Sequence, residues 1–314
     1  MLASLGLVPL GCDGLVDGLV DGRTLRAVSR GAGVALDGWA GRVVVASAAA
    51  AYIGDADGGL VVLRDVASFK AGTNTSTSVV VPSYRMHDWT VDGWCRVHRG
   101  RLVGPRVTVD LRGVAVWRPR SLSGMLRESV LTPDELNSFN RVVGAAIPLR
   151  RSADVVGSRL DTLVSTLVAA ESTSGDDIPA AVLENAVRAL VGFGPGLTPS
   201  GDDAIVGTLA ILHALGLSHL VGRLASVLAG LVGRTTIVAT HQLRRAVVGD
   251  FAEPIVAVVE ALAWWSGSGA CGPVGAALRT LLGVGATSGA DTLLGMIVAL
   301  ETFARSDAAA PAPS

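Results

Sequence analysis

The chain is poor in aromatic residues, and this shortage limits how its core can be built. Aromatic residues make up 4% of the 314 residues, although 50% of the residues are hydrophobic. Ala, Val and Leu must therefore form most of the buried surface, and such small side chains favour close packing between helices. The length is sufficient for two domains or one large one with an ample core.

Cysteine is also scarce, which argues against a disulfide framework and against a cysteine-based metal site. Cys12, Cys95 and Cys271 are odd in number and far apart, and no two of them form a Cys-x-x-Cys pair. This usage is typical of a reducing compartment. We therefore expect a cytoplasmic protein. The apolar start that ends in Leu10-Gly11-Cys12 hints at a lipoprotein cleavage site, but no basic region precedes it.

The sequence has neither an excess of charge of one sign nor a long apolar run. The formal net charge is -1 and the basic residues are scattered, which disfavours nucleic acid and anionic membrane surfaces as partners. A membrane-spanning helix needs about 20 apolar residues without charge. The most apolar stretch, residues 204–217, is shorter and contains His213, so we interpret it as a buried core helix with a core histidine.

Two periodicities divide the chain into a β-rich part and a helical part. Val-rich segments broken by Gly, Asp or Pro predict an antiparallel sheet, sandwich or small barrel with strands over residues 42–46, 60–63, 77–81, 94–97 and 107–116. Thr132 to Glu135 predicts a helix start, and apolar residues at helical spacing predict further helices over residues 153–170, 179–191, 202–217, 219–233, 236–249, 253–265, 274–283 and 289–305. We therefore predict an α+β fold with a β-rich domain over residues 1–118, a helical domain over 119–305 and a disordered tail over 306–314.

One stretch of the helical part is unusual in its glycine and proline content. Residues 192–203 read Gly-Phe-Gly-Pro-Gly-Leu-Thr-Pro-Ser-Gly-Asp-Asp and lead directly into the most apolar segment. Glycine and proline exclude regular structure at first, and Ser200 followed by Asp203 predicts a helix that begins with a reciprocal cap. We expect Asp203 to be partly structural. Asp202 is then freer to hold Mg²⁺, orient a water or accept hydrogen bonds from an NH₂ group.

A second segment repeats this pattern near the end of the chain. Gly283-Val284-Gly285, then Ser288-Gly289-Ala290-Asp291 and Gly295, parallels the first loop with its Ser200, Asp203 and Gly207. Free N–H groups and the positive dipole at a helix start attract anions. We therefore hypothesise that the two helix starts converge on one pocket. The alternative is that both segments are capping boxes whose glycines permit tight helix packing.

Other patterns are weaker. The Gly-x-x-x-x-Gly spacing of Gly196 and Gly201 resembles a phosphate loop, but Asp202-Asp203 replaces the expected Lys-Ser/Thr and disfavours a Walker-type nucleotide site. A further Ser-Gly-Asp-Asp at residues 174–177 lacks preceding glycines and is interpreted as a solvated loop. Three side chains on or just before one predicted helix, those of Thr236, His241 and Arg244, could together bind a phosphate or a carboxylate. The alternative is that the arginine lies on a solvated face of the helix.

The candidate site combines these segments. The candidate catalytic residues are Asp202, Asp203 and His241. The candidate substrate-binding residues are Gly194, Gly196, Thr198, Ser200, Gly201, Thr236, Arg244, Ser288, Gly289 and Asp291. We assign no metal site and no certain cofactor, and Mg²⁺ stays open as an alternative.

Residues Gly196 to Asp203, with Gly207 and the later Ser288-Gly289-x-Asp291, make the chain resemble a long uncharacterised bacterial family. The family is typified by AllH, a subunit of the oxamate carbamoyltransferase of anaerobic allantoin degradation, and the similarity covers about residues 120–305. It implies a subunit of an enzyme that moves a carbamoyl group between oxamate and phosphate, giving oxalurate or carbamoyl phosphate. Other subunits and a small anionic substrate would then be its partners. A non-catalytic assembly or regulatory subunit and a Mg²⁺-dependent phosphate-handling enzyme are the alternatives.

Overall fold

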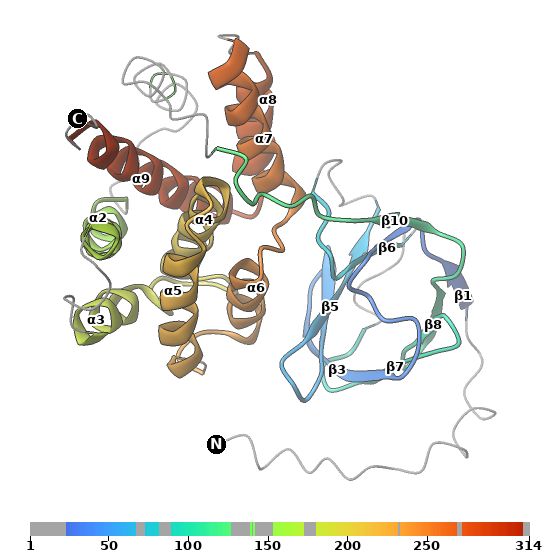
Figure 1. The fold of residues 1–314 in the computed structure, drawn as a ribbon. Helices are drawn as coiled ribbons and strands as arrows, with labels where there is room; N and C mark the ends of the chain where they lie inside the picture. Colours follow the sequence, from blue (N-terminus) through green and yellow to red (C-terminus); the bar gives the residue numbers. More distant parts are fainter. Residues whose placement is uncertain are drawn as a thin grey trace.

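The structure, a computed structural model, combines a curled β-sheet with a helical region (Figure 1). The strands come first in the chain and the helices follow, so the predicted α+β fold is confirmed. The structure describes residues 23–66, 73–81, 89–126, 139, 141, 153–172, 180–231, 233–268 and 272–309.

Within the described residues, ten strands form a single sheet with the order β1-β9-β8-β7-β3-β4-β5-β6-β2-β10. The pairs β1–β9, β5–β6 and β2–β10 are parallel, whereas the other neighbours are antiparallel. The expected antiparallel arrangement is therefore only partly correct, because the chain also returns across the sheet by longer connections. The strands are β1 (Arg23–Arg26), β2 (Ser29–Gly31), β3 (Trp39–Ala46), β4 (Ala50–Gly54), β5 (Leu60–Asp65), β6 (Ser78–Val81), β7 (Trp94–His98), β8 (Arg101–Val103), β9 (Val107–Asp110) and β10 (Ala115–Trp117).

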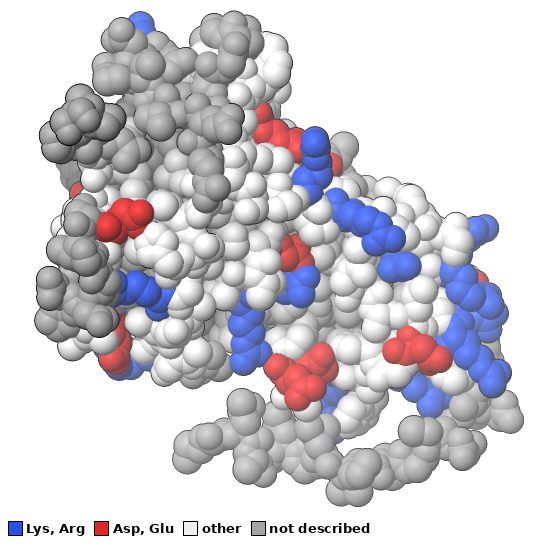
Figure 2. Space-filling view, in the orientation of Figure 1, with Lys and Arg blue, Asp and Glu red and all other residues white. Residues whose placement is uncertain are grey.

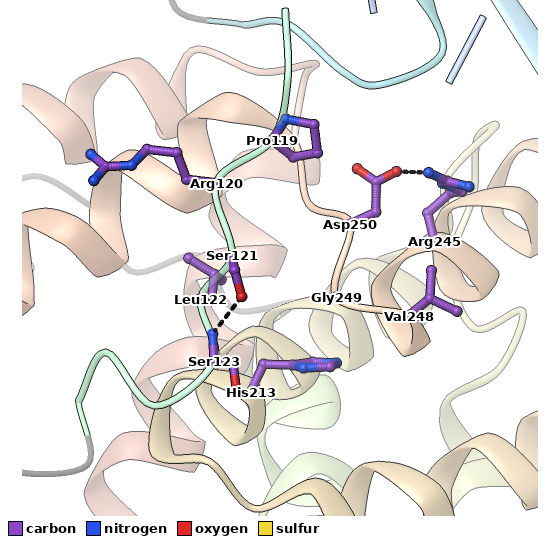
Figure 3. Close-up of a pocket in the computed structure, with 10 residues that line it drawn as sticks. All are labelled: Pro119, Arg120, Ser121, Leu122, Ser123, His213, Arg245, Val248, Gly249 and Asp250. Atoms are coloured by element: carbon purple, nitrogen blue, oxygen red, sulfur yellow. Dashed lines mark hydrogen bonds and ion pairs between the residues drawn. The ribbon is translucent and has the colours of Figure 1, made fainter. Parts of the chain in front are cut away.

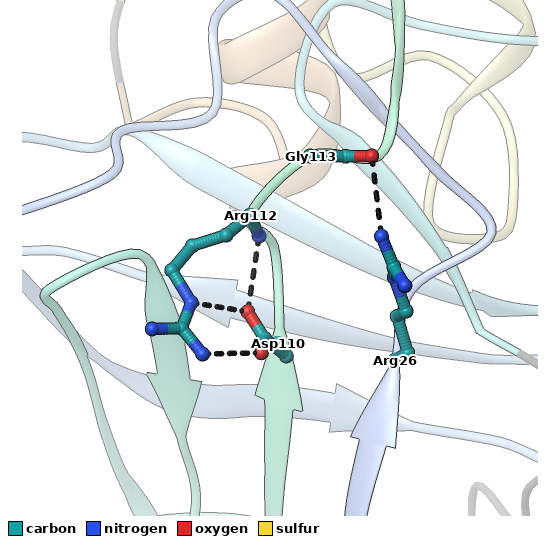
Figure 4. Close-up of polar contacts among 4 residues, drawn as sticks. All are labelled: Arg26, Asp110, Arg112 and Gly113. Atoms are coloured by element: carbon teal, nitrogen blue, oxygen red, sulfur yellow. Dashed lines mark hydrogen bonds and ion pairs between the residues drawn. The ribbon is translucent and has the colours of Figure 1, made fainter.

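The strand expected over residues 107–116 is in fact two strands separated by a turn. The Arg112 guanidinium donates to both oxygens of Asp110, at 2.8 and 2.6 Å, and Gly113 takes a φ of +62°. Arg26 of β1 donates to the Gly113 carbonyl at 3.4 Å (Figure 4). These contacts fix a tight turn after β9, so the chain leaves one end of the sheet and joins the other as β10.

The helices lie close to their predicted positions, with boundaries that agree to within about one turn. The helix predicted to begin at Thr132 lies outside the described residues. Residues 306–309 of the predicted tail are helical, because the last helix extends to Ala309. The helices are α2 (Ala153–Ser172), α3 (Ala180–Leu190), α4 (Ser200–Leu215), α5 (Ser218–Gly230), α6 (Ile237–Val247), α7 (Glu253–Ser268), α8 (Gly272–Leu282) and α9 (Ser288–Ala309).

Helix α4 is the centre of the helical region. Almost every residue from Gly201 to Ala214 is buried, and α9, α6, α5, α7 and α2 all contact this helix. A helix that is apolar all round must be covered on all sides. The most apolar stretch of the sequence is therefore a core helix, as predicted. None of the helices in the described part of the chain is both long enough and apolar enough to cross a membrane.

The sheet and the helical region each have their own hydrophobic cluster. Polar side chains join the two regions. Both the backbone N–H and the side-chain amide of Asn74 donate to Glu253 at the start of α7, at 3.0 and 2.6 Å. Arg245 of α6 donates to Ser76 at 3.3 Å. On the face shown in Figure 2, acidic and basic side chains are interspersed, and the basic ones gather over the sheet.

Candidate functional site

The first Gly-rich loop folds back on the end of α3. Gly194 and Gly196 have backbone φ values of +113° and +102°, which residues other than glycine rarely adopt. A Cβ on Gly201 would overlap the carbonyl of Leu190, so no other residue fits there. The Gly201 N–H donates to the Phe193 carbonyl at 2.9 Å. The N–H of Gly201, a candidate substrate-binding residue, is therefore not among the free N–H groups expected at a helix start.

The N-cap of helix α4 is one residue earlier than the predicted N-cap, Ser200. Pro199 is the N-cap, with an extended ψ of 144°, and no side chain within the described residues caps it. The N–H groups of Asp202 and Asp203 both donate to the Pro199 carbonyl, at 3.0 and 3.1 Å. The reciprocal cap between Ser200 and Asp203 is therefore wrong, because Ser200 already lies inside the helix. Asp203 is left for another contact.

Asp202 fastens the loop to the segment before α6. Its side chain is 1% exposed, and both of its carboxylate oxygens accept from the Gly192 N–H at 3.2 Å. The Thr235 hydroxyl donates to Asp202 Oδ2 at 2.5 Å. Burial raises the pKa of Asp202, and the hydrogen bonds from Thr235 and Gly192 oppose this shift. The expectation that Asp202 is the freer carboxylate is therefore wrong, since its oxygens already hold the loop.

Asp203 is the carboxyl group with spare hydrogen-bonding capacity. It is 4% exposed, and its Oδ2 has no hydrogen-bond partner within the described residues. Burial raises the pKa of Asp203 to about 8, and the nearby charges of Asp291 and Asp202 add to this effect. Hydrogen bonds from Ser288 and Thr198 act in the opposite direction. The surroundings of Asp203 therefore favour the neutral carboxylic acid over the carboxylate.

The second Gly-rich loop meets the first at this point. The hydroxyls of Thr198 and Ser288 lie 2.7 Å apart, although the residues are far apart in the sequence. Asp291, one turn into α9, is half-buried and its Oδ2 also has no partner among the described groups. We call Thr198, Asp203, Ser288 and Asp291 the loop junction. The two helix starts thus lie side by side.

The two loops also resemble each other in detail. A Cβ on Gly289 would overlap the carbonyl of Leu281, as one on Gly201 would overlap that of Leu190. The Gly289 N–H donates to Val284 within its own loop, at 3.1 Å. Each loop is therefore packed against the end of the preceding helix by a glycine just inside the next helix.

Of the three candidates on or before α6, only Thr236 contacts the first loop. Its hydroxyl donates to the Leu197 carbonyl and accepts from the Ala239 N–H at 3.0 Å, so it also caps α6. His241 and Arg244 instead face the β-sheet.

His241 and Arg244 form part of the contact between the two regions. His241 is 9% exposed, and its Nε2 lies 3.3 Å from the Thr77 hydroxyl. Burial lowers the pKa of His241 to about 4, and the charge of Arg245 lowers it further. Arg244 donates to the Asp57 carbonyl at 2.8 Å. The structure therefore gives these two predicted site residues contacts with the sheet, away from the loop junction residues.

Two cavities open among the described residues, and neither of these two is lined by a loop junction residue. One, of about 420 Å³, is mainly apolar and includes Thr235 and Arg244 in its wall. The other, of about 430 Å³, lies where the chain passes from the sheet to the helices (Figure 3). There His213 and the Arg245–Asp250 ion pair face residues 119–123. No group of three or more His, Cys, Asp or Glu side chains within the described ranges could hold a metal ion.

Sequence reasoning missed one residue that supports the loop. The Arg159 guanidinium lies 3.9 Å from the centre of the Phe193 ring and donates to the Ala189 carbonyl at 2.5 Å. No local pattern could have indicated this role, because the contact joins α2 to a loop that follows a different helix.

The fold and the loop junction define an α+β protein in which two Gly-rich turns and the helices after them meet at one point. Over residues 190–300, the chain matches the family described as oxamate carbamoyltransferase subunit AllH. The resemblance predicted from the sequence is confirmed for this region, which contains both loops. No solved structure matches the chain significantly.

Proposed function

We propose that this chain is a subunit of a carbamoyltransferase-like enzyme and that it handles a small anionic substrate at the loop junction. One observation carries the proposal. The region that matches the AllH family, residues 190–300, includes all four junction residues. The family description names a subunit, so the proposal includes partner subunits in a larger enzyme.

The chemistry of the junction suits carbamoyl compounds such as oxamate, oxalurate or carbamoyl phosphate. The hydroxyls of Thr198 and Ser288 can donate to a carboxylate or phosphate oxygen. A neutral Asp203 donates as well, whereas an ionised carboxylate would repel the anion. The positive dipole ends of α4 and α9 add to the attraction, and Asp291 can accept from the substrate NH₂.

The exposed ends of the loops support a site that is completed by another subunit. Residues 194–197 and 285–287 are exposed, and they include Leu197, whose side chain is 42% exposed. A partner that docks on these ends would exclude water from the junction and could supply a basic side chain for the substrate anion. We therefore expect the purified chain to be inactive alone.

The test is phosphate-dependent cleavage of oxalurate, measured with the purified chain alone and after assembly with its partner subunits. The assembled enzyme should release carbamoyl phosphate, and Ser288→Ala should reduce the rate at least tenfold through the lost hydroxyl. Ser226→Ala, which removes an exposed hydroxyl on α5, is the matched control. Absence of transfer in every assembly would contradict the proposal.

A non-catalytic assembly or regulatory subunit is the second candidate. The observation that favours it is the internal use of the N–H groups of Gly201 and Gly289, which removes two donors from any anion site. In that case the assembled enzyme would keep its full activity with Thr198→Val and Ser288→Ala together.

A Mg²⁺-dependent phosphate-handling enzyme, the other alternative, would instead lose its activity when a chelator removes the metal ion.

A further inference from the structure

We infer that the apolar cavity between α5 and α6 binds a small carboxylic acid with an apolar chain, and that Arg244 recognises its carboxylate. The cavity has a volume of about 420 Å³, and no loop junction residue lines it. Its ligand therefore differs in place and in chemistry from the polar substrate proposed above. The inference does not depend on carbamoyl transfer, because it concerns a separate site.

The wall of this cavity is mostly apolar. Helices α5 and α6 contact each other, and residues of both line the cavity together with the residue that follows α3 (Figure 1). The buried part of the wall includes Val191, Leu228, Leu231 and Leu243, whereas Val248 at the rim is 68% exposed. An apolar chain that covers these side chains removes them from water, which contributes about 25 cal/mol for each Å² of apolar surface.

The polar side chains in the wall come from α6 and the segment before it. They are those of Thr235, Thr240 and Arg244. The Thr235 hydroxyl already donates to Asp202. Thr240 and Arg244 are four residues apart on α6, so their side chains lie on the same face of the helix. A hydroxyl and a guanidinium on that face can both donate to one carboxylate.

Arg244 is an arginine without a carboxylate partner among the described residues. Its neighbour Arg245 pairs with Asp250, whereas Arg244 donates to the Asp57 carbonyl at 2.8 Å. A guanidinium carries five N–H donors in a planar fork that matches the two oxygens of a carboxylate. The bond to Asp57 holds the guanidinium at the cavity and leaves further donors for a ligand.

An apolar wall with one cation is complementary to an acid with a short hydrocarbon chain. The volume lies within the range of about 300–1,000 Å³ that is typical of small-molecule sites, which are mostly apolar with a few polar groups. In this arrangement the chain covers the buried leucines, and the carboxylate pairs with Arg244 and accepts from the Thr240 hydroxyl. Oxamate and carbamoyl phosphate have no such chain, so the cavity disfavours them.

The test is isothermal titration calorimetry of the purified chain with butanoate, hexanoate and octanoate. Each added CH₂ should tighten binding about fourfold, since burial of one CH₂ contributes about 0.8 kcal/mol. Hexan-1-ol has the same chain as hexanoate without the charge, and it should bind more weakly by roughly tenfold or more. Absence of saturable binding of hexanoate and octanoate would overturn the inference, and so would equal binding of hexanoate and hexan-1-ol.

Variants of Arg244 test the recognition of the carboxylate. Arg244→Gln should weaken hexanoate binding by roughly tenfold or more and leave hexan-1-ol binding unchanged, which also shows that the cavity stays folded. Arg244→Lys keeps the charge without the planar fork and should bind hexanoate with intermediate affinity. Arg279→Gln removes an exposed arginine of α8 that does not line the cavity, and it is the matched control. Unchanged hexanoate binding in Arg244→Gln would contradict the inference.

Two further variants locate the ligand. Ala229→Phe places a large ring at an exposed position of the cavity wall and should weaken the binding of hexanoate and hexan-1-ol alike. Ser288→Ala changes the loop junction and should bind hexanoate as the wild-type chain does. Loss of hexanoate binding in Ser288→Ala but not in Ala229→Phe would place the acid at the loop junction and overturn the inference. Because none of these measurements uses activity, the inference can fail while the proposed function stands.

Discussion

Gly207 of α4 and Gly295 of α9 each lie against the backbone of the other's helix. A Cβ on Gly207 would overlap the Thr292 carbonyl, and a Cβ on Gly295 would overlap the Ala204 carbonyl. The two helices therefore cross at backbone contact, with a glycine from each at the crossing. Because both glycines lie two turns into their helices, the crossing also fixes the distance between the two helix starts at the loop junction.

Gly207→Ala should destabilise the protein by about 1–3 kcal/mol, since the added methyl group forces the two helices apart. Gly222→Ala on α5 is the matched control, because a Cβ there meets nothing within 4 Å. That change should be neutral or should stabilise by about 0.5–1 kcal/mol, as expected for glycine in a helix interior. Urea unfolding of the two variants measures the difference. Equal effects would mean that the crossing is not as tight as described.

Asp203→Asn should make the protein more stable at alkaline pH. The pKa of Asp203 is raised from 3.8 to about 8, so the folded protein holds this proton more tightly than the unfolded chain. The group's contribution to stability is full below about pH 4 and is lost as the pH rises through 8. The difference in melting temperature between the variant and the wild-type protein should therefore increase as the pH rises from 5 to 9. Parallel melting curves across this range would show that Asp203 is already ionised.

Asp202→Asn should loosen the first loop without removing a reacting group. The variant keeps the shape of the side chain but weakens the bonds from Thr235 and Gly192, at a cost of about 1–3 kcal/mol. Thr235→Val should have a similar effect. Combined with Asp202→Asn, it should add little, because both act on the same contact. Thermal unfolding of the two single variants and the double variant measures this coupling, and additive losses would contradict it.

His241 should make the contact between the sheet and the helices sensitive to acid. Its pKa is lowered from 6.5 to about 4, so the folded protein favours the neutral ring. The resulting stability is full above pH 6.5 and is lost as the pH falls toward 4. His241→Gln should remove this dependence, which a comparison of urea unfolding at pH 7 and pH 4.5 would reveal. If His241→Gln loses as much stability at pH 4.5 as the wild-type protein does, other groups cause the loss.

The helices could be predicted well because each carries its own signal. Residues 237–247, for example, have apolar spacing at helical period behind Thr236, which caps the helix as a threonine at that position should. Short strands carry much less signal. Strands β1, β2 and β8 have three or four residues each and contain arginine, so nothing in their sequences marks them as parts of a sheet. Their pairing with distant strands forms them.

The site was predicted only in its outline. The repeat of Ser-Gly-x-Asp indicated that residues 200–203 and 288–291 belong together, and the contact between Thr198 and Ser288 joins them. The roles of the two carboxyl groups were assigned the wrong way round. Local spacing made Asp203 a cap, but the capping position belongs to Pro199. Asp203 is left with one carboxyl oxygen, Oδ2, that has no partner among the described residues, whereas Asp202 is bonded to Thr235.

The sequence by itself determined the α+β division, the helices and the two Gly-rich loops, because apolar spacing, glycine and proline act over a few residues. Only the tertiary structure decided which carboxyl group is held by hydrogen bonds and which is buried without a full set of partners. It also decided that His241 and Arg244 contact the sheet. These outcomes depend on contacts between residues far apart in the chain, and no local pattern encodes the burial and the partners that such contacts create.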